Sequence, residues 1–346
     1  MVENNRKWYE KAGESADVVI STRVRLARNL AAYPFPNRMT PDQKADVERR
    51  VRDALLNGNS AIASDFTYMQ MDDLSNEQAV SLVERHMVSP EFIANSKGRG
   101  ILISKDESVS IMVNEEDHVR IQILREGLSL RETAEMADRI DTLLNEHLNF
   151  AFDPELGFLT QCPTNLGTGM RASVMLHLPA LTESGAMGRI ASNLSKLGLV
   201  IRGTYGEGSN VTGALYQLSN QITLGLSERE AVENLQNIAT QLIQEERKAR
   251  KALLKNIATQ DRIGRAAGIL RGAKMLSCEE YMKLISNVRF GLAEGVLSGA
   301  TLEDINALTA AVQPATLTAA RGGSLTAAQR DIARADCVRA ALSHLQ

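Results

Sequence analysis

Five arginines stand in short apolar segments whose alternation predicts β-strands. Arg23 and Arg25 lie in VVISTRVRLARNL, Arg120 in NEEDHVRIQIL, Arg171 in GTGMRASVMLHLP and Arg202 in LGLVIRGTYGEGS. Successive residues of a strand point to opposite faces, so Arg23 and Arg25 share one face. Arginine keeps its charge and offers a planar fork of donors. If these strands are neighbours, their arginines form a site for a polyanion, of which a nucleoside triphosphate is the leading candidate.

Three consecutive acids precede the strand that carries Arg120. They are Glu115, Glu116 and Asp117, in the segment NEEDH. An ordinary solvated turn would have the same composition. Next to a phosphate-binding arginine, however, an acid cluster fits a site that holds a cation beside a phosphate. That cation could be Mg²⁺ or a guanidinium.

Two further segments rich in small residues each carry one side chain that could act on a substrate. Cys162 lies in QCPTNLGTGMR, and Glu207 lies in RGTYGEGS. A lone cysteine is most often a small core residue, but among arginines its thiol would ionise more easily and could steer a cationic substrate. Glu207 follows a predicted strand, so its loop is either a lid that closes on a substrate or an ordinary hairpin loop.

The elements that must position these residues change in type along the chain. Helices are predicted at 40–57, which opens with Thr40-Pro41, and at 129–148, where Ser129 and Glu132 form a capping-box pattern. A long helix from Ser227 to about residue 256 precedes helical segments at 261–271, 279–297, 301–312 and 324–344. Strands and helices without regular β-α-β alternation favour an α+β fold. We expect a catalytic domain over residues 1–256 and a small all-helical domain over 257–346.

Composition excludes several classes of protein. Of the 346 residues, 44% are hydrophobic and 23% charged, as in soluble globular proteins. The net charge of −3 argues against direct nucleic-acid binding. No apolar run approaches the roughly 20 residues that span a bilayer, and the N-terminal segment lacks the apolar core of a signal peptide. The three cysteines are widely spaced, so we expect a reduced, cytoplasmic protein.

Known nucleotide-binding motifs are also missing. The sequence contains no G-x-x-x-x-G-K-[ST] loop and no H-R-D or D-F-G set. A triphosphate would therefore be held by arginines and not by a P-loop lysine.

Four segments together resemble the ATP:guanido phosphotransferases, the phosphagen kinase family. They are STRVRLARN, NEEDHVR, CPTNLGTGMRA and RGTYGEG, in that order, and the resemblance covers about residues 15–249. It implies an antiparallel sheet flanked by helices. Within the family the chain is most similar to bacterial protein arginine kinases. The first arginine motif lies close to the N-terminus, a helical C-terminal region follows, and that region contains RDIARA.

The resemblance implies roles for individual residues. Glu116 and Glu207 would align the acceptor guanidinium and take its proton, with Glu115 assisting and Cys162 tuning the guanidinium. The expected nucleotide site consists of Ser21, Thr22, Arg23, Val24, Arg25, His86, Arg120, Arg171, Ala172, Ser173, Val174, Met175, Arg202, Gly203, Thr204, Tyr205, Gly206 and Glu207.

An allosteric phosphoarginine site is implied for the RDIARA segment. Its residues would be Arg330, Asp331, Arg334 and Ala335. On spacing alone, Asp331 and Arg334 could be an ordinary exposed helix pair.

The implied substrates are ATP and arginine side chains of proteins, with Mg²⁺ held mainly by phosphate oxygens and water and no protein metal ligand. Phosphorylation would mark proteins for the ClpC–ClpP protease and inactivate a CtsR-like repressor. Further expected partners are unfolded proteins, a McsA-like activator, and other copies of the chain in a homodimer or larger homo-oligomer. We expect no direct contact with nucleic acid or membrane. Two alternatives stay open: a non-catalytic adaptor that delivers proteins to a protease, and a kinase of free arginine.

Overall fold

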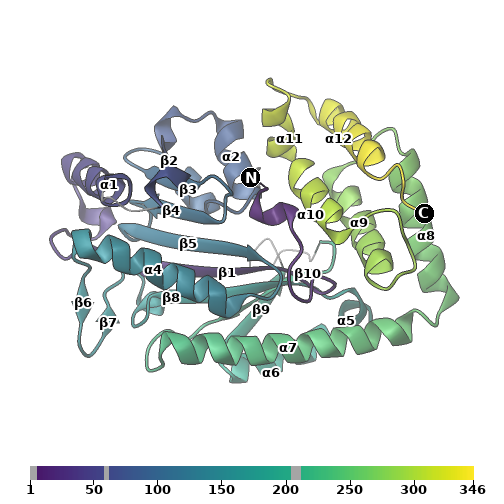
Figure 1. The fold of residues 1–346 in the computed structure, drawn as a ribbon, viewed down its shortest axis with the longest axis horizontal. Coiled ribbons are helices and arrows are strands. Elements are labelled where there is room, and N and C mark those ends of the chain that lie inside the picture. The colour runs from purple at the N-terminus through teal and green to yellow at the C-terminus, as the bar shows by residue number, and fades with distance from the viewer. Residues whose placement is uncertain (1–5, 58–61, 204–211) are drawn as a thin grey trace.

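The computed structural model describes residues 6–57, 62–203 and 212–346. Within these ranges the chain builds one large antiparallel sheet with helices around it, which confirms the predicted α+β class (Figure 1). The small strands β6 (Phe152–Asp153) and β7 (Gly157–Phe158) form a separate hairpin. Across the large sheet the strands are β2 (Phe66–Gln70), β3 (Gly100–Ser104), β4 (Val109–Val113), β5 (Val119–Glu126), β1 (Val19–Arg28), β8 (Met170–His177), β10 (Leu215–Asn220) and β9 (Leu199–Gly203).

The predicted helices are present, and five helices of the described residues that were not predicted join them, at Asn76–Glu84, Pro90–Ile93, Pro179–Glu183, Met187–Lys196 and Pro314–Ala320. The capping boxes at Thr40 and Ser227 form, whereas Ser129 makes no side-chain cap and instead donates to the carbonyl of Glu126. The helices are α1 (Pro41–Leu56), α2 (Asn76–Glu84), α3 (Pro90–Ile93), α4 (Leu130–Leu148), α5 (Pro179–Glu183), α6 (Met187–Lys196), α7 (Glu228–Leu253), α8 (Ile257–Gly272), α9 (Cys278–Ala293), α10 (Leu302–Ala311), α11 (Pro314–Ala320) and α12 (Ala327–Ala341).

Helix α11 was not predicted because its start depends on a distant residue. Glu84, at the end of α2, accepts hydrogen bonds from the backbone N–H groups of Ala315 and Thr316 at 2.8 and 2.7 Å. A carboxylate at a helix N-terminus satisfies unpaired donors and complements the helix dipole. The side-chain cap therefore comes from another part of the chain, and the local signal of a helix start is limited to Pro314 in the first turn.

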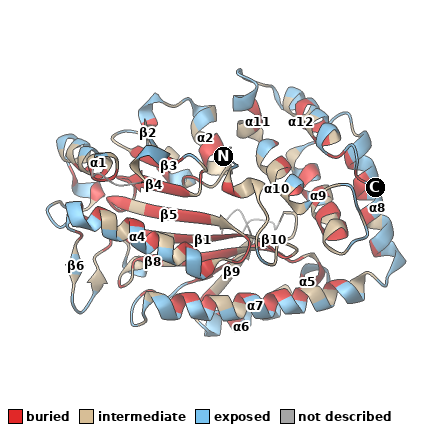
Figure 2. Ribbon diagram, viewed as in Figure 1, coloured by how far each residue is buried: buried red, intermediate tan, exposed pale blue. Residues whose placement is uncertain are grey.

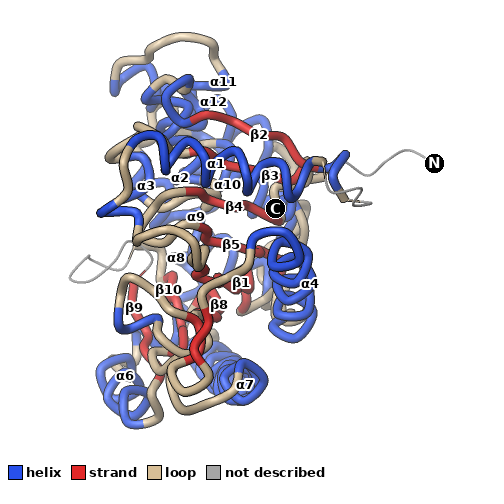
Figure 3. Tube along the Cα trace, turned by 90° about the vertical axis from the view of Figure 1, so that its left-hand side faces the viewer, coloured by secondary structure: helices blue, strands red, loops and turns tan. Residues whose placement is uncertain are grey.

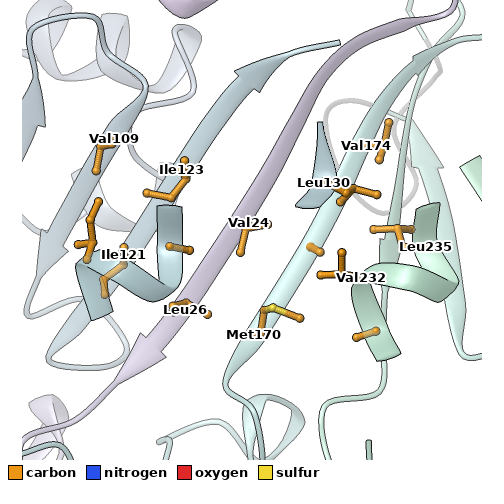
Figure 4. Close-up of a cluster of buried hydrophobic side chains, with 14 of the residues drawn as sticks. Val24, Leu26, Val109, Ile121, Ile123, Leu130, Met170, Val174, Val232 and Leu235 are labelled. Atoms are coloured by element: carbon orange, nitrogen blue, oxygen red, sulfur yellow. The ribbon is translucent and has the colours of Figure 1, made fainter. Parts of the chain in front are cut away.

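One face of the large sheet carries the main hydrophobic core. Val24 of β1 and Ile121 of β5 pack there against Leu130 of α4, and Leu235 extends the core from α7 (Figure 4). The end-on view shows α4 and α7 beside this face (Figure 3). Burial is concentrated along the central strands (Figure 2). Because this face is sealed by helices, Arg23 and Arg25 of β1 point to the other face, whereas Arg28 lies on the sealed face and is paired there with Asp141 of α4.

Arg28, at the end of β1, fixes the loop before β8. Its side chain is 1% exposed, donates from Nε to Asp141 of α4 at 2.9 Å, and donates from Nη1 to the carbonyl of Thr168 at 2.9 Å. Gly169 follows with φ +62°, and a Cβ there would lie 2.7 Å from the carbonyl oxygen of Ala27. The small residues of this loop therefore permit close approach of protein backbone.

The C-terminal helices α8–α12 have their own hydrophobic cluster, which includes Leu270, Tyr281 and Val338. They lie against one end of the sheet region (Figure 1). That packing brings side chains of α9 and α10 next to the segment before β1 and the end of β8.

A buried ion pair joins α7 to its surroundings. Glu246 and Arg250 are both fully buried, with Arg250 Nε donating to Glu246 at 2.8 Å. Glu246 also accepts from the backbone N–H groups of Ala180 and Leu181, which start α5. Arg250 donates to the carbonyl of Asp17, just before β1. The pair thus ties α7 and α5 to the N-terminal end of the central strand.

We expect Glu246→Ala to lower the free energy of unfolding by about 3–5 kcal/mol, because it leaves a buried guanidinium without its carboxylate and two backbone donors without partners. Chemical denaturation would measure the change. Asp261→Ala is the control, since it removes an exposed helix pair with Arg265 and should change the value by less than about 1 kcal/mol. Equal effects of the two substitutions would contradict this assignment.

Candidate functional site

Strand register brings four of the five arginines together on one face of the sheet. Arg25 lies directly opposite Arg171 of β8 and Gln122 of β5. Directly opposed residues share a face, as do residues two apart in one strand. Arg23 and Arg120 therefore lie on this face too. It is the face opposite the core formed with α4 and α7.

The fifth arginine joins them through the edge strands. Met175 is four positions after Arg171 in β8 and lies opposite Gln217 of β10, which in turn lies opposite Arg202 of β9. Arg202 thus shares the face, and the arginines come from four strands. Gln217, which sequence reasoning missed, accepts a hydrogen bond from Arg23 Nη2 at 3.0 Å. No strand was expected over Leu215–Asn220, and the neighbours of Gln217 in the sheet are set by long-range strand pairing.

The clustered guanidiniums disfavour one another's charge. Burial and then the neighbouring Arg171 and Arg120 lower the pKa of Arg23 to about 10. Burial and then Arg23 hold the pKa of Arg25 well below its ordinary value. Nε of Arg171 is buried and has no hydrogen-bond partner in the described chain. Crowded cations with unused donors are suited to a bound polyanion, whose charge would offset their repulsion.

The acid cluster meets the arginines at Arg120. Nη1 of Arg120 lies 2.6 Å from a carboxylate oxygen of Glu115, and Nη2 lies 3.2 Å from one of Glu116. Glu115 is buried and also accepts from the hydroxyl of Ser89. The side chain of Glu116 is 39% exposed, and partial burial is the main cause that raises its pKa. Glu115 therefore holds Arg120 in place, and Glu116 is the acid accessible to a second cation.

The third acid positions the cysteine loop. Asp117 is fully buried and accepts from Asn29 Nδ2 at 2.6 Å and from the backbone N–H of Gln161 at 2.8 Å. Cys162 comes next in the chain and is partly exposed, with Sγ 3.0 Å from the hydroxyl of Thr164. Asp117 thus anchors the segment with Cys162 beside the segment with Glu116.

His86 is held in an unusual backbone conformation near Arg23. Its φ is +66°, and Gln122 Nε2 donates to its carbonyl oxygen at 2.7 Å. Burial and then the charge of Arg23 lower the pKa of the imidazole to about 4, so the ring is neutral at pH 7. Its ring centroid lies 6.4 Å from that of Trp8.

A cavity of about 480 Å³ adjoins this face. Ser21, Arg23, Arg25, His86 and Met175, all predicted nucleotide-site residues, line it. Trp8 also lines it and was not predicted, although it is the chain's single tryptophan. The volume lies within the usual range for small-molecule sites.

The remaining predicted nucleotide residues divide between three places. Ser173 lies on the arginine face opposite Arg23, and Gly203 ends β9. Thr204, Tyr205, Gly206 and Glu207 lie outside the residues that the structure describes. The last group is fully buried on the helix-covered face and alternates with the arginines along β1 and β8: Thr22, Val24, Ala172 and Val174.

The RDIARA segment lies on α12, away from the cavity. Arg334 is 1% exposed and donates to the carbonyls of Val312 and Leu276 at 3.0 and 2.8 Å and to Asp331 at 2.7 Å. Arg330 is less buried and donates to the carbonyl of Leu325. Ala335 is buried beside them. The structure therefore directs the two guanidiniums to different partners, and the role of the segment in binding phosphoarginine stays a prediction.

The described residues contain neither a metal-ligand cluster nor a helix suited to a membrane. No group of three or more His, Cys, Asp or Glu side chains there is placed to hold a metal ion. No helix in the same residues has the length and hydrophobicity to cross a membrane.

Comparison with known families defines the class of protein. The model described as "ATP:guanido phosphotransferase, C-terminal catalytic domain" matches residues 46–249, and that described as "Protein-arginine kinase McsB C-terminal domain" matches residues 256–346. Solved structures agree: a lombricine kinase aligns with TM-score 0.60 and 29% identity, covering 68% of each chain. A duplicated taurocyamine kinase from Schistosoma mansoni, with bound transition state analog components, also aligns at TM-score 0.60 and 27% identity, covering 81% of this chain and 41% of that one.

Proteins similar to this chain over nearly its full length identify a subgroup within that class. A protein from Caldanaerobacter subterraneus named "Protein-arginine kinase" is 47% identical over 94% of this chain and 97% of its own length. One of the same name from Symbiobacterium thermophilum is 46% identical over 97% of this chain and 96% of its own. The chain belongs to the ATP:guanido phosphotransferase family and, within it, to the McsB-type protein-arginine kinases.

Because the clustered arginines repel one another, we expect the residues that bind an anion to lower the free energy of unfolding of the protein. We expect Arg25→Gln to raise the free energy of unfolding of the ligand-free protein by about 1 kcal/mol, because a desolvated and repelled charge is removed. The same variant should lose most of the stabilisation that inorganic tripolyphosphate gives the unaltered protein. Thermal unfolding with and without tripolyphosphate measures both effects.

Arg139→Gln, at a helix position where the side chain is 71% exposed, is the control and should change neither quantity. A ligand-free Arg25→Gln protein that is less stable than the unaltered one would refute the repulsion argument.

Proposed function

We propose that the protein transfers the γ-phosphoryl group of ATP to arginine side chains of proteins. The observation that carries this proposal is the contact of Arg120 with both Glu115 and Glu116. An acid that would bind a guanidinium thus borders an arginine face that would bind a triphosphate. The names of the relatives support a protein arginine as the acceptor.

The arginine face would act mainly by alignment and electrostatics. Negative charge spreads over the equatorial oxygens of a transferring phosphoryl group, and Arg25, Arg120 and Arg171 would meet that charge. Mg²⁺, held by phosphate oxygens and water, would neutralise further charge when ATP is bound. The pairing of β1 with β5 and β8 fixes these arginines on one face of the sheet, where they would act together on the phosphates.

Glu116 would accept the proton. A guanidinium has a pKa above about 12 and carries no available lone pair until it loses a proton. As the new N–P bond forms and the bond between the γ-phosphorus and the bridging oxygen breaks, Glu116 takes one N–H proton, and ADP leaves with the electron pair of the broken bond. Glu207 would hold the other side of the guanidinium, and Cys162 would tune it without forming a covalent intermediate.

The proposal extends to what the modification does. Phosphorylation replaces the fixed positive charge of an arginine with negative charge, which would weaken a DNA contact of a CtsR-like repressor. We further propose that phosphorylated proteins pass to ClpC–ClpP in the cytoplasm, that a McsA-like activator assists, and that the protein works as a homo-oligomer. The helical region over 257–346 would be a separate domain for assembly and sensing.

Incubation with Mg-ATP and either free arginine or an arginine-rich unfolded protein tests the activity. We expect acid-labile phosphoarginine, read by ³¹P NMR, on the protein substrate alone. Glu116→Gln should reduce the rate by at least about 100-fold, because the proton acceptor is lost. Because the pKa of Glu116 is raised, activity of the unaltered protein should fall as pH drops through that raised pKa and the carboxylate becomes protonated.

Glu135→Gln, on the exposed surface of α4, is the matched control and should keep full activity. Phosphate on free arginine would instead support a small-molecule arginine kinase. No transfer to either acceptor, with the protein still able to deliver clients to a protease, would support the adaptor.

The allosteric proposal rests on Arg330, Asp331, Arg334 and Ala335. Arg330→Ala should reduce stimulation of the kinase by free phosphoarginine, because one of two guanidiniums that could bind the phosphoryl group is removed. Arg334→Ala should in addition lower stability by about 3 kcal/mol, since Arg334 is buried and bonded to backbone carbonyls. Activity assays with added phosphoarginine and denaturation curves separate the two effects, and undiminished stimulation of Arg330→Ala would refute the proposal.

A further inference from the structure

Two of the walls of the cavity beside the arginine face come from different parts of the fold. One wall is the sheet, with Ser21, Arg23 and Arg25 of β1. The other belongs to the C-terminal helices. From α9 and α10 it includes Met282, Ile285, Ser286, Arg289, Thr309 and Ala310. The cavity therefore lies between the phosphotransferase sheet and the helical region.

Only one end of the arginine face opens into this cavity. Arg23 and Arg25 line it, but Arg120 and Arg171 are not among its lining residues. Arg120 pairs with Ala27, so the direction from Arg25 toward Ser21 along β1 leads away from Arg120 and its acids. A triphosphate whose γ-phosphate lies near Arg120 would thus extend its other end past Arg23 and Ser21 into the cavity.

Two buried donors in the cavity wall lack partners. Nε1 of Trp8 and Nε of Arg289 are buried and have no hydrogen-bond partner among the described residues. Both residues line the cavity, and they are 3% and 4% exposed. Buried N–H groups are nearly always paired, so such donors indicate a ligand with acceptor atoms. A nucleoside supplies them as ring nitrogens and ribose oxygens, and the apolar side chains around them fit the faces of a base.

The helical wall is fastened to the sheet side by polar contacts. Arg289 Nη2 donates to the carbonyl of Ala16 at 2.8 Å, and Asn306 Nδ2 donates to that of Lys11 at 2.9 Å. His177, the last residue of β8, lies with Nε2 2.8 Å from the hydroxyl of Ser286. These bonds hold α9 and α10 at a set distance from β1 and β8 and so define the width of the cavity.

We propose that α9 and α10 form one wall of the nucleoside pocket, with the base and ribose of ATP between these helices and the sheet. The C-terminal region would then contribute directly to nucleotide binding and selectivity. This inference rests on the proposed use of ATP. It adds that affinity for the nucleoside half depends on residues outside the phosphotransferase sheet.

The test compares neighbouring alanines on α10 with a ligand that lacks the nucleoside. Ala310 lines the cavity, whereas Ala311 is exposed and does not. We expect Ala310→Phe to weaken ATP binding by at least about tenfold, because the ring would occupy the space of the base, and to leave tripolyphosphate binding unchanged. Ala311→Phe should bind both ligands as the unaltered protein does. Calorimetric titration measures all six affinities.

The single tryptophan provides a readout that needs no substitution. Saturating ATP should change the emission of Trp8, and saturating tripolyphosphate should change it much less. Equal ATP affinity of the two phenylalanine variants, or equal weakening of both ligands by Ala310→Phe, would overturn the inference while leaving the proposed function intact. Failure of the unaltered protein to bind ATP at all would remove both.

Discussion

Mutual repulsion among arginines on one face of a sheet is the constraint on which the rest of this structure depends. Burial and neighbouring guanidiniums lower the pKa of Arg23 and Arg25, so the site costs stability in the absence of a bound anion. The opposite face must supply that stability, and it does so with a core sealed by α4 and α7. A wide antiparallel sheet suits this division because its two faces are independent in composition.

Arg120 lies between the cationic part of the site, formed by the arginines, and its acidic part, formed by Glu115 and Glu116. It stands at the edge of the arginine face and yet contacts two carboxylates. The buried Glu115 neutralises it locally, while the more exposed Glu116 is left to meet a cationic substrate. The difference in burial between the two adjacent acids agrees with the chemical role proposed for Glu116 and with Glu115 as the partner that positions Arg120. Asp117 completes the arrangement by anchoring the cysteine loop nearby.

The C-terminal helices are part of the site's architecture and not a detached appendage. Glu84 caps α11, His177 meets Ser286, and Arg289 reaches the chain before β1. Each contact starts from an element that also borders the cavity or the central strands. A change in the packing of the helical region would thus alter the cavity, which offers a physical route from that region to nucleotide affinity. Arg334 acts within the same region as a buried support, bonded to the carbonyls of Val312 and Leu276.

The sequence by itself determined which residues share a face within each strand, because alternation is local. Arg23 and Arg25 could be assigned to the same face without knowledge of the neighbouring strands. It also determined the helix starts at Thr40 and Ser227, whose caps lie within one turn, and the motifs that mark the family. Only the tertiary structure decided that Arg25 stands opposite Arg171, that Glu84 starts α11, and that Trp8 and Arg289 meet at one cavity. These pairings join positions far apart in the chain, and long-range packing, which leaves no local pattern, selects them. Local alternation thus specifies which side chains each strand places on each face of the sheet. The order of the strands then specifies which of these side chains form one binding site.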